Sequence, residues 1–145
     1  MEEYGLEKSV FISHSSCDAQ ICTEVCNVIE KHGIKCWIAP RDVTGGMPYA
    51  EEIVKAIKET KIVLLVASVS INSSEQILNE IEIAISHSKI ILPFKIDAVV
   101  YNDSYKYYLN RKHWIEASPD PSMHYSELLK TIDYLLTSKG DKTYT

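Results

Sequence analysis

Short apolar runs alternate with amphipathic helical patterns along this chain, and this alternation limits the possible folds more than any other feature. The most informative run is "KIVLLVAS" (61–68), which is almost continuously apolar and rich in β-branched residues. Such a run is typical of a central strand covered on both faces. Strand and helix patterns follow each other about five times with short connections, which predicts an α/β domain with a parallel sheet. The predicted strands are 9–13, 34–39, 61–68, 89–97 and 113–117; the predicted helices are 17–33, 48–57, 70–86 and 122–136, with one short helix within 101–112.

We expect the commonest five-stranded arrangement of this class, a flavodoxin-like three-layer sandwich with strand order 2-1-3-4-5 and helices on both faces. Ligands in such sheets bind beyond the carboxyl ends of the strands, at the switch point between strands 1 and 3. "SHSSCD" follows strand 1, "APRDVTGG" follows strand 2 and "SVSINSSEQILNE" follows strand 3. The sequence therefore predicts a cleft lined by the start of the 70–86 helix and by Ser13, His14, Ser15, Arg41, Asp42 and Ser68.

Size and charge narrow the class of protein. The chain has 145 residues and a formal net charge of −5. We interpret residues 1–138 as a single domain and 139–145 as a polar tail. The negative charge argues against nucleic acid or an anionic membrane as the partner. No apolar run approaches the roughly 20 residues of a membrane span, and the first residues lack a signal-peptide pattern, so the expected location is the cytoplasm.

The cysteines fit a reducing compartment. Cys22 and Cys26 are one helical turn apart on an apolar face, and Cys17 and Cys36 form no CxxC pair with them. No histidine or acid is recognised beside them at ligand spacing, so we predict no metal site. The expected role of the thiols is that of small buried hydrophobes.

Several uses of this fold are excluded by the residues at the strand ends. A phosphorylated receiver would need acids after strands 1 and 3, where the chain has Ser13, His14 and Ser68. There is no GxGxxG after strand 1 and no Walker lysine loop, and "SHSS" lacks the glycine of a flavodoxin phosphate loop. A nucleophile pair of His14 with Ser13 or Ser15 lacks an evident third acid to orient it, which disfavours that hypothesis.

The helix "SINSSEQILNEIEIAIS" (70–86) has one unusual feature. Its apolar stripe is centred on Ile77, Leu78, Ile81, Ala84 and Ile85. Glu80 and Glu82 flank the two edges (shoulders) of that stripe instead of lying on the far side of the helix. Periodicity alone does not tell which shoulder faces the cleft, and a shoulder glutamate is by default a solvated residue at the rim of the packing surface.

Three motifs in register carry a resemblance to a known family. They are "FISHSSCD" as strand and first loop, "WIAPRDVTGG" as second strand and following loop, and the serine-rich start of a helix that continues into "NEIEIA". Together they resemble the Toll/interleukin-1 receptor (TIR) domain family, especially its bacterial members. The resemblance runs from about Ser9 to about Trp114, most of the chain.

The resemblance implies a function. Many TIR domains cleave NAD⁺ at the nicotinamide–ribose bond, giving nicotinamide and ADP-ribose or a cyclised ADP-ribose, in immune or anti-phage signalling. Their catalytic glutamate stands immediately before an apolar residue and four before a small one, which matches Glu80, before Ile81 and Ala84, and not Glu82. The substrate-binding residues expected beside it are Ser13, His14, Ser15, Trp37, Arg41, Asp42, Gly45, Gly46, Ser68 and Gln76, with no metal and no cofactor, NAD⁺ being the substrate.

The chemistry is compatible with so few functional groups. Nicotinamide is bound as a cation and leaves as a neutral molecule, so its departure needs no acid. The oxocarbenium-like ribose needs negative charge and a hydrogen bond to its hydroxyls, and one carboxylate provides both. We expect Arg41 and the N–H groups of Gly45–Gly46 to contact the diphosphate. Trp37 either stacks on a substrate ring or belongs to the core.

Gln76 departs from the family pattern, because several active members have an aromatic residue four positions before the catalytic glutamate. This departure affects the expected nicotinamide pocket. Two alternatives to an NAD⁺-cleaving enzyme stay open: a non-catalytic module that only assembles with other TIR domains, and a nucleoside 2-deoxyribosyltransferase-like enzyme. The expected partners are NAD⁺, other TIR domains bound through the loop 40–47 (the BB loop of the family), an upstream sensor and a downstream effector that binds the product.

Overall fold

The run "KIVLLVAS" forms the centre of the sheet in the computed structural model, which describes residues 8–110 and 112–137. All six side chains of β3 (Ile62–Ala67) are buried. β3 pairs in parallel with β1 (Val10–Ser13) on one side and with β4 (Ile90–Lys95) on the other. The proposed tail 139–145 lies outside the described residues.

The predicted strand order is confirmed: the five strands run β2-β1-β3-β4-β5, all parallel. Both edge strands are shorter than predicted, β2 being Cys36–Trp37 and β5 Ile115–Glu116. β2 stops early because the N–H of Ile38 donates to the Asp42 carboxylate, at 2.9 Å, instead of continuing the ladder. The chain therefore leaves the sheet sooner than its apolar pattern "IKCWIA" suggested.

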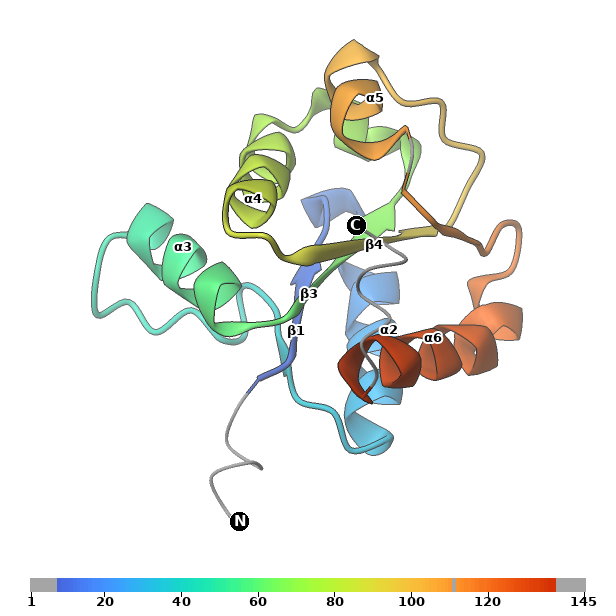
Figure 1. Cartoon of the computed structure of the whole chain (residues 1–145), viewed down its shortest axis with the longest axis horizontal. Helices are drawn as coiled ribbons and strands as arrows, with labels where there is room; N and C mark the ends of the chain where they lie inside the picture. The colour runs from blue at the N-terminus through green and yellow to red at the C-terminus, as the bar shows by residue number, and fades with distance from the viewer. Residues whose placement is uncertain (1–7, 111, 138–145) are drawn as a thin grey trace.

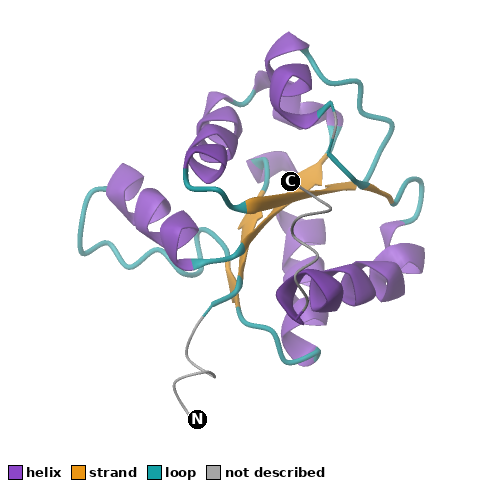
Figure 2. Ribbon diagram, in the orientation of Figure 1, coloured by secondary structure: helices purple, strands orange, loops and turns teal. Residues whose placement is uncertain are grey.

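Helices cover both faces of the sheet (Figures 1 and 2). α2 (Ala19–Lys31) and α6 (Tyr125–Thr137) pack on one face. α3 (Tyr49–Glu59), α4 (Glu75–Ser86) and α5 (Asp103–Leu109) pack on the other. Each layer has its own apolar core, as expected of a three-layer sandwich. None of the described helices is long and apolar enough to cross a membrane.

Three of the predicted helices begin later than expected, because short 3₁₀ turns precede them. These turns are η1 (Ser16–Asp18), η2 (Val69–Ser73) and η3 (Pro121–His124). Before α4, the Ser74 side chain accepts from the N–H of Ile77 at 3.1 Å and serves as the N-cap. Ser15 and Asp18 have the spacing of a capping box, which predicts a helix start here, but they do not form one: Ser15 caps η1, and the Asp18 carboxylate accepts a hydrogen bond from Ser68.

Candidate active site

Glu80 lies in α4 and points at the carboxyl end of β1. Its side chain is only 5% exposed, and its Oε1 accepts a hydrogen bond from the Ser13 hydroxyl at 2.7 Å. Glu82 lies on the outer shoulder and accepts from the hydroxyl of Tyr108 in α5 at 3.0 Å. The structure thus decides between the two shoulders that periodicity left open. Glu80 is buried, which corrects the default expectation of a solvated rim residue.

Gln76, one turn before Glu80, connects it to a third element. Its side-chain nitrogen lies 3.2 Å from Glu80 Oε2 and 2.9 Å from the hydroxyl of Tyr49, the first residue of α3. Tyr49 did not appear among the predicted site residues. The only signal for it was its place directly after Pro48, at the start of a helix that follows the BB loop.

The electrostatic state of Glu80 is set mainly by its burial. Burial raises the pKa of the Glu80 carboxyl above its ordinary value, while the hydrogen bonds from Ser13 and Gln76 and the nearby His14 lower it in part. Both carboxyl oxygens are held by a donor, so the group has a fixed orientation. A buried carboxylate with a fixed orientation interacts with a developing positive charge more strongly than one in water.

A cleft of about 510 Å³ opens beside Glu80, between the strand 1 loop, the BB loop and the start of α4. A second hollow, of about 710 Å³, lies between α3 and α4 and also borders Glu80. A third hollow of similar size, at Lys8, Glu52 and Glu59, contains neither Glu80 nor the "SHSS" loop and has no part in this site. Five of the predicted residues border the first cleft: His14, Ser15, Trp37, Gln76 and Glu80.

The serine and histidine side chains beside Glu80 form no nucleophile pair among the described contacts. The Ser13 hydroxyl donates to Glu80, and the Ser15 hydroxyl accepts from the N–H of Cys17. The two ring nitrogens of His14 face the carbonyl oxygens of Ser15, at 2.8 Å, and Ala39, at 3.4 Å. We therefore assign no nucleophilic role to this loop.

Ser68 and Trp37 have other contacts than the sequence suggested. The Ser68 hydroxyl donates to Asp18 and accepts from the N–H of Ser70, and Ser68 does not border the cleft. Trp37 is 8% exposed and stacks on Phe11, with ring centroids 5.1 Å apart. Of the two roles considered for Trp37, the core role describes most of its surface, and only an edge of the residue borders the cleft.

Arg41 and Asp42 are also directed away from the cleft. The Arg41 guanidinium holds both carboxylate oxygens of Glu30 at 2.9 Å, the Asp42 carboxylate at 2.8 Å and the Cys36 carbonyl at 2.9 Å. A bidentate guanidinium–carboxylate pair of this kind fixes the side chain strongly. The structure therefore does not bring Arg41 or Asp42 to the diphosphate position expected for them.

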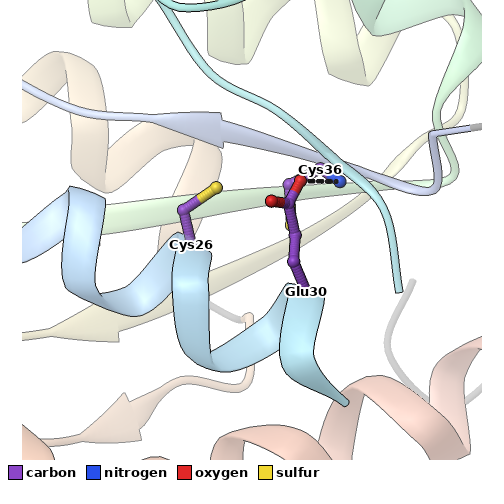
Figure 3. Close-up of side chains that lie close together, drawn as sticks. All are labelled: Cys26, Glu30 and Cys36. Atoms are coloured by element: carbon purple, nitrogen blue, oxygen red, sulfur yellow. Dashed lines mark hydrogen bonds between the residues drawn. The ribbon is translucent and has the colours of Figure 1, made fainter. Parts of the chain in front are cut away.

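Figure 3 shows Cys26 and Glu30 of α2 next to Cys36, whose N–H donates to Glu30. Arg41 contacts all three of these residues. The two sulfur atoms and a Glu30 carboxylate oxygen lie within 4.8 Å of one another, so the expectation that no acid lies beside the cysteines is wrong. Glu30 is one helical turn after Cys26, a spacing visible in the sequence. Because Arg41 already binds both oxygens of Glu30, the cluster is an ion-pair network, and we propose no metal there.

The family of the chain follows from comparison with known proteins. A family model described as TIR domain matches residues 10–129. The chain belongs to the TIR domain family. The match extends past the stretch 9–114 on which the sequence motifs lie, and it includes η3 and the start of α6. The bacterial subtype stays a prediction.

Solved structures share the fold of this TIR domain at low identity. The TIR domains of the activated Roq1 resistosome, which recognises the pathogen effector XopQ, match with a TM-score of 0.73 and 19% identity over 87% of this chain and 99% of theirs. The TIR domain of the Toll-related receptor TRR-2 from Hydra magnipapillata matches with a TM-score of 0.71 and 22% identity, over 85% of this chain and 95% of that one. The Clostridium botulinum CMP N-glycosidase BcmB matches with a TM-score of 0.57 and 18% identity, over 87% of this chain and 99% of that one. No curated protein matches the sequence.

One buried carboxylate, that of Glu52, accepts the hydrogen bonds that fix the BB loop of this TIR domain. Glu52 of α3 accepts from the N–H of Thr44 at 2.7 Å, from its hydroxyl at 3.1 Å and from the N–H of Gly45 at 2.7 Å. These hydrogen bonds lower the pKa of Glu52 below its ordinary value, and the bond from the Thr44 N–H has the largest effect. The sequence predicts that the N–H groups of Gly45 and Gly46 contact a diphosphate, but the Gly45 N–H already donates to Glu52, and neither glycine borders the cleft.

Replacing Glu52 by glutamine should loosen the BB loop without unfolding the domain. The amide retains one acceptor oxygen and loses the other, so we expect hydrogen exchange at the N–H groups of Thr44 and Gly45 to become about tenfold faster. Glu51→Gln, a change at an exposed neighbour in the same helix, is the matched control. Exchange rates equal to those of the parent protein would show that Glu52 does not hold the loop. In the parent, the same acceleration should appear only as the pH falls through the lowered pKa of Glu52.

Proposed function

We propose that this TIR domain cleaves NAD⁺ at the bond between nicotinamide and ribose. The observation that carries the proposal is the buried Glu80, held by Ser13 and Gln76 at the edge of an open cleft of about 510 Å³. The cleft lies at the switch point of the sheet, where ligands of this fold class bind. Few acids and bases border the cleft, which suits a reaction whose leaving group needs no proton.

The chemistry asks three things of Glu80. As nicotinamide departs, positive charge develops on the ribose, and the ionised carboxylate stabilises it electrostatically. The same carboxylate accepts a hydrogen bond from a ribose hydroxyl. The donors Ser13 and Gln76 keep the carboxylate oriented, so it does not have to reorganise during the reaction. Water, or a nucleophilic atom of the substrate's own adenine, then takes the place of nicotinamide, giving ADP-ribose or its cyclic form.

Self-association belongs to this proposal. An enzyme that destroys NAD⁺ is harmful if it is always active, and the TIR domains in the Roq1 structure belong to an activated resistosome. We propose that this domain is likewise activated by assembly with other copies through the BB loop, in immune or anti-phage signalling in the cytoplasm. An upstream sensor would start the assembly, and an effector would bind the product.

The test is to incubate the purified protein with NAD⁺, with CMP and with deoxynucleosides, and to measure the released base by chromatography. Each substrate is tried over a wide range of protein concentrations. Release of nicotinamide alone is the expected result. Release of cytosine or of a base from deoxynucleosides would indicate an N-glycosidase or deoxyribosyltransferase instead, in keeping with the shared fold of BcmB. No release from any of them, at any concentration, would favour a pure assembly module.

A further inference from the structure

The two hollows beside Glu80 lie next to each other and share part of their lining. The cleft and the α3–α4 hollow share Tyr49, Ile53, Gln76 and Glu80. The bond between the Gln76 nitrogen and the Tyr49 hydroxyl joins α3 to α4 at this boundary. Glu80 therefore borders both hollows, so a substrate cleaved at Glu80 can place its two halves in different hollows.

The α3–α4 hollow has the surface of a site for a flat organic cation. Among the described residues, three glutamates border it, Glu75, Glu80 and Glu82, and no lysine or arginine does. The rest of its lining is uncharged, with apolar side chains from Ala50, Ile53, Val54 and Ile83. The cleft differs, since Glu80 is the only acid among the described residues that border it, and serines form much of the rest. A diphosphate is thus repelled more strongly from the α3–α4 hollow than from the cleft, while a positively charged ring is attracted to the hollow.

Tyr49 is placed to bind such a ring. Its side chain is 46% exposed, so much of the aromatic surface is open to a ligand. The hydroxyl accepts from Gln76 and can still donate its own proton, so the ring is tethered without using up its polar group. When Glu80 is ionised, the Gln76 amide must turn its N–H₂ towards the carboxylate, and this keeps the tether to Tyr49 in place.

We propose that Tyr49 is the residue that contacts the pyridinium ring of the substrate, held in position by Gln76. This inference rests on the proposed function and adds a residue to it. The aromatic face attracts the cation, and the attraction weakens when the ring departs as a neutral base. Tyr49 therefore stabilises the bound substrate more than the transition state, and its loss should raise KM without lowering kcat.

The test uses Tyr49→Leu, which keeps an apolar side chain but removes the ring, and Tyr49→Phe, which keeps the ring. Tyr107→Leu, at a tyrosine of α5 that is 83% exposed and borders neither hollow, is the control. With NAD⁺ as substrate, we expect Tyr49→Leu to raise KM about tenfold with kcat changed less than about threefold. Tyr49→Phe keeps the ring but loses the hydrogen bond to Gln76, so its KM should rise by an intermediate factor of about threefold, and Tyr107→Leu should match the parent in both constants.

A binding experiment separates this inference from the proposed function. The probes are 1-methylnicotinamide, a pyridinium cation without ribose, and benzamide, its uncharged counterpart, titrated by NMR. We expect the parent to bind the cation several-fold more tightly than benzamide, and Tyr49→Leu to lose that preference. If this holds although the parent releases no nicotinamide from NAD⁺, the proposed function fails and the ring site stands. If KM and cation binding are the same in Tyr49→Leu and the parent, or the parent does not bind the cation, the inference is overturned.

Discussion

Replacing Glu80 by glutamine should lower the rate of nicotinamide release at least about a thousandfold. The substitution removes the negative charge that faces the oxocarbenium-like ribose but keeps the volume of the side chain. The amide can still accept from Gln76 through its oxygen and donate to the Ser13 hydroxyl through its nitrogen, in place of the two bonds of the carboxylate. The loss would therefore report on charge rather than on disturbed packing. It is measured as nicotinamide released per molecule of protein at a fixed protein concentration.

Glu51→Gln is the matched control, since Glu51 is an exposed glutamate of α3 that borders neither the cleft nor the α3–α4 hollow. We expect it to change the rate less than about threefold, as is usual for a surface substitution. Equal rates for Glu80→Gln and the parent would remove Glu80 from the mechanism. Equal losses in both variants would indicate a general effect of removing a negative charge from the domain.

Glu80→Gln should also stabilise the fold at neutral pH, by about 1 kcal/mol. Burial raises the pKa of Glu80, so between the unfolded and the folded pKa the folded parent holds a proton that the unfolded chain has lost. The stability of the parent therefore falls as the pH rises through the folded pKa. The gain in the variant should thus be absent below the ordinary glutamate pKa and grow above it. Glu80→Ala should instead destabilise by about 1–3 kcal/mol, since the buried Ser13 hydroxyl loses its acceptor. Thermal unfolding at several pH values checks both expectations.

The specific activity of the parent should rise steeply with protein concentration or on clustering. The Glu80 cleft is open beside the BB loop, and a head-to-tail contact through that loop would let a neighbouring copy complete it. Such heterologous contacts propagate into filaments rather than closed dimers, so activity should depend on concentration more strongly than for a dimer. A dilution series of nicotinamide release, with light scattering on the same samples, measures this. Constant specific activity from dilute to crowded solution would show that assembly does not switch the enzyme.

Gly46→Asp should suppress that rise without unfolding the domain, and Gly46→Ala should largely preserve it. A Cβ at Gly46 meets only the Thr44 hydroxyl, at 3.7 Å, so a side chain there extends from the loop surface. Gly45 is less suitable for this substitution, although the sequence predicts the same role for both glycines. Its φ of +79° is one that L side chains rarely adopt, and its N–H is bound to Glu52. A change at Gly45 would alter the backbone of the loop as well as its surface.

The sequence by itself determined the architecture. The alternation of apolar runs with helical patterns gave five parallel strands in the order that the structure has, because these patterns are local and the connection rules leave few topologies. The boundaries were less accurate. α4, for example, begins after Ser74 rather than at Ser70, about one turn later than predicted, since a 3₁₀ turn and an α-helix start with the same residue types.

The tertiary structure alone decided which side chains meet. The sequence placed Glu80 on one of two shoulders, and the rotation of α4 against β1 buried it beside Ser13. Arg41 follows the second strand as expected, but the nearness of Glu30 in α2 turned it away from the cleft, and no local pattern records a contact between two segments. Gln76 stands where several family members have an aromatic residue, and the packing of α3 against α4 brings the Tyr49 hydroxyl to the Gln76 side chain. Secondary structure depends on neighbours along the chain, whereas the composition of a cleft depends on how separate elements are turned against one another.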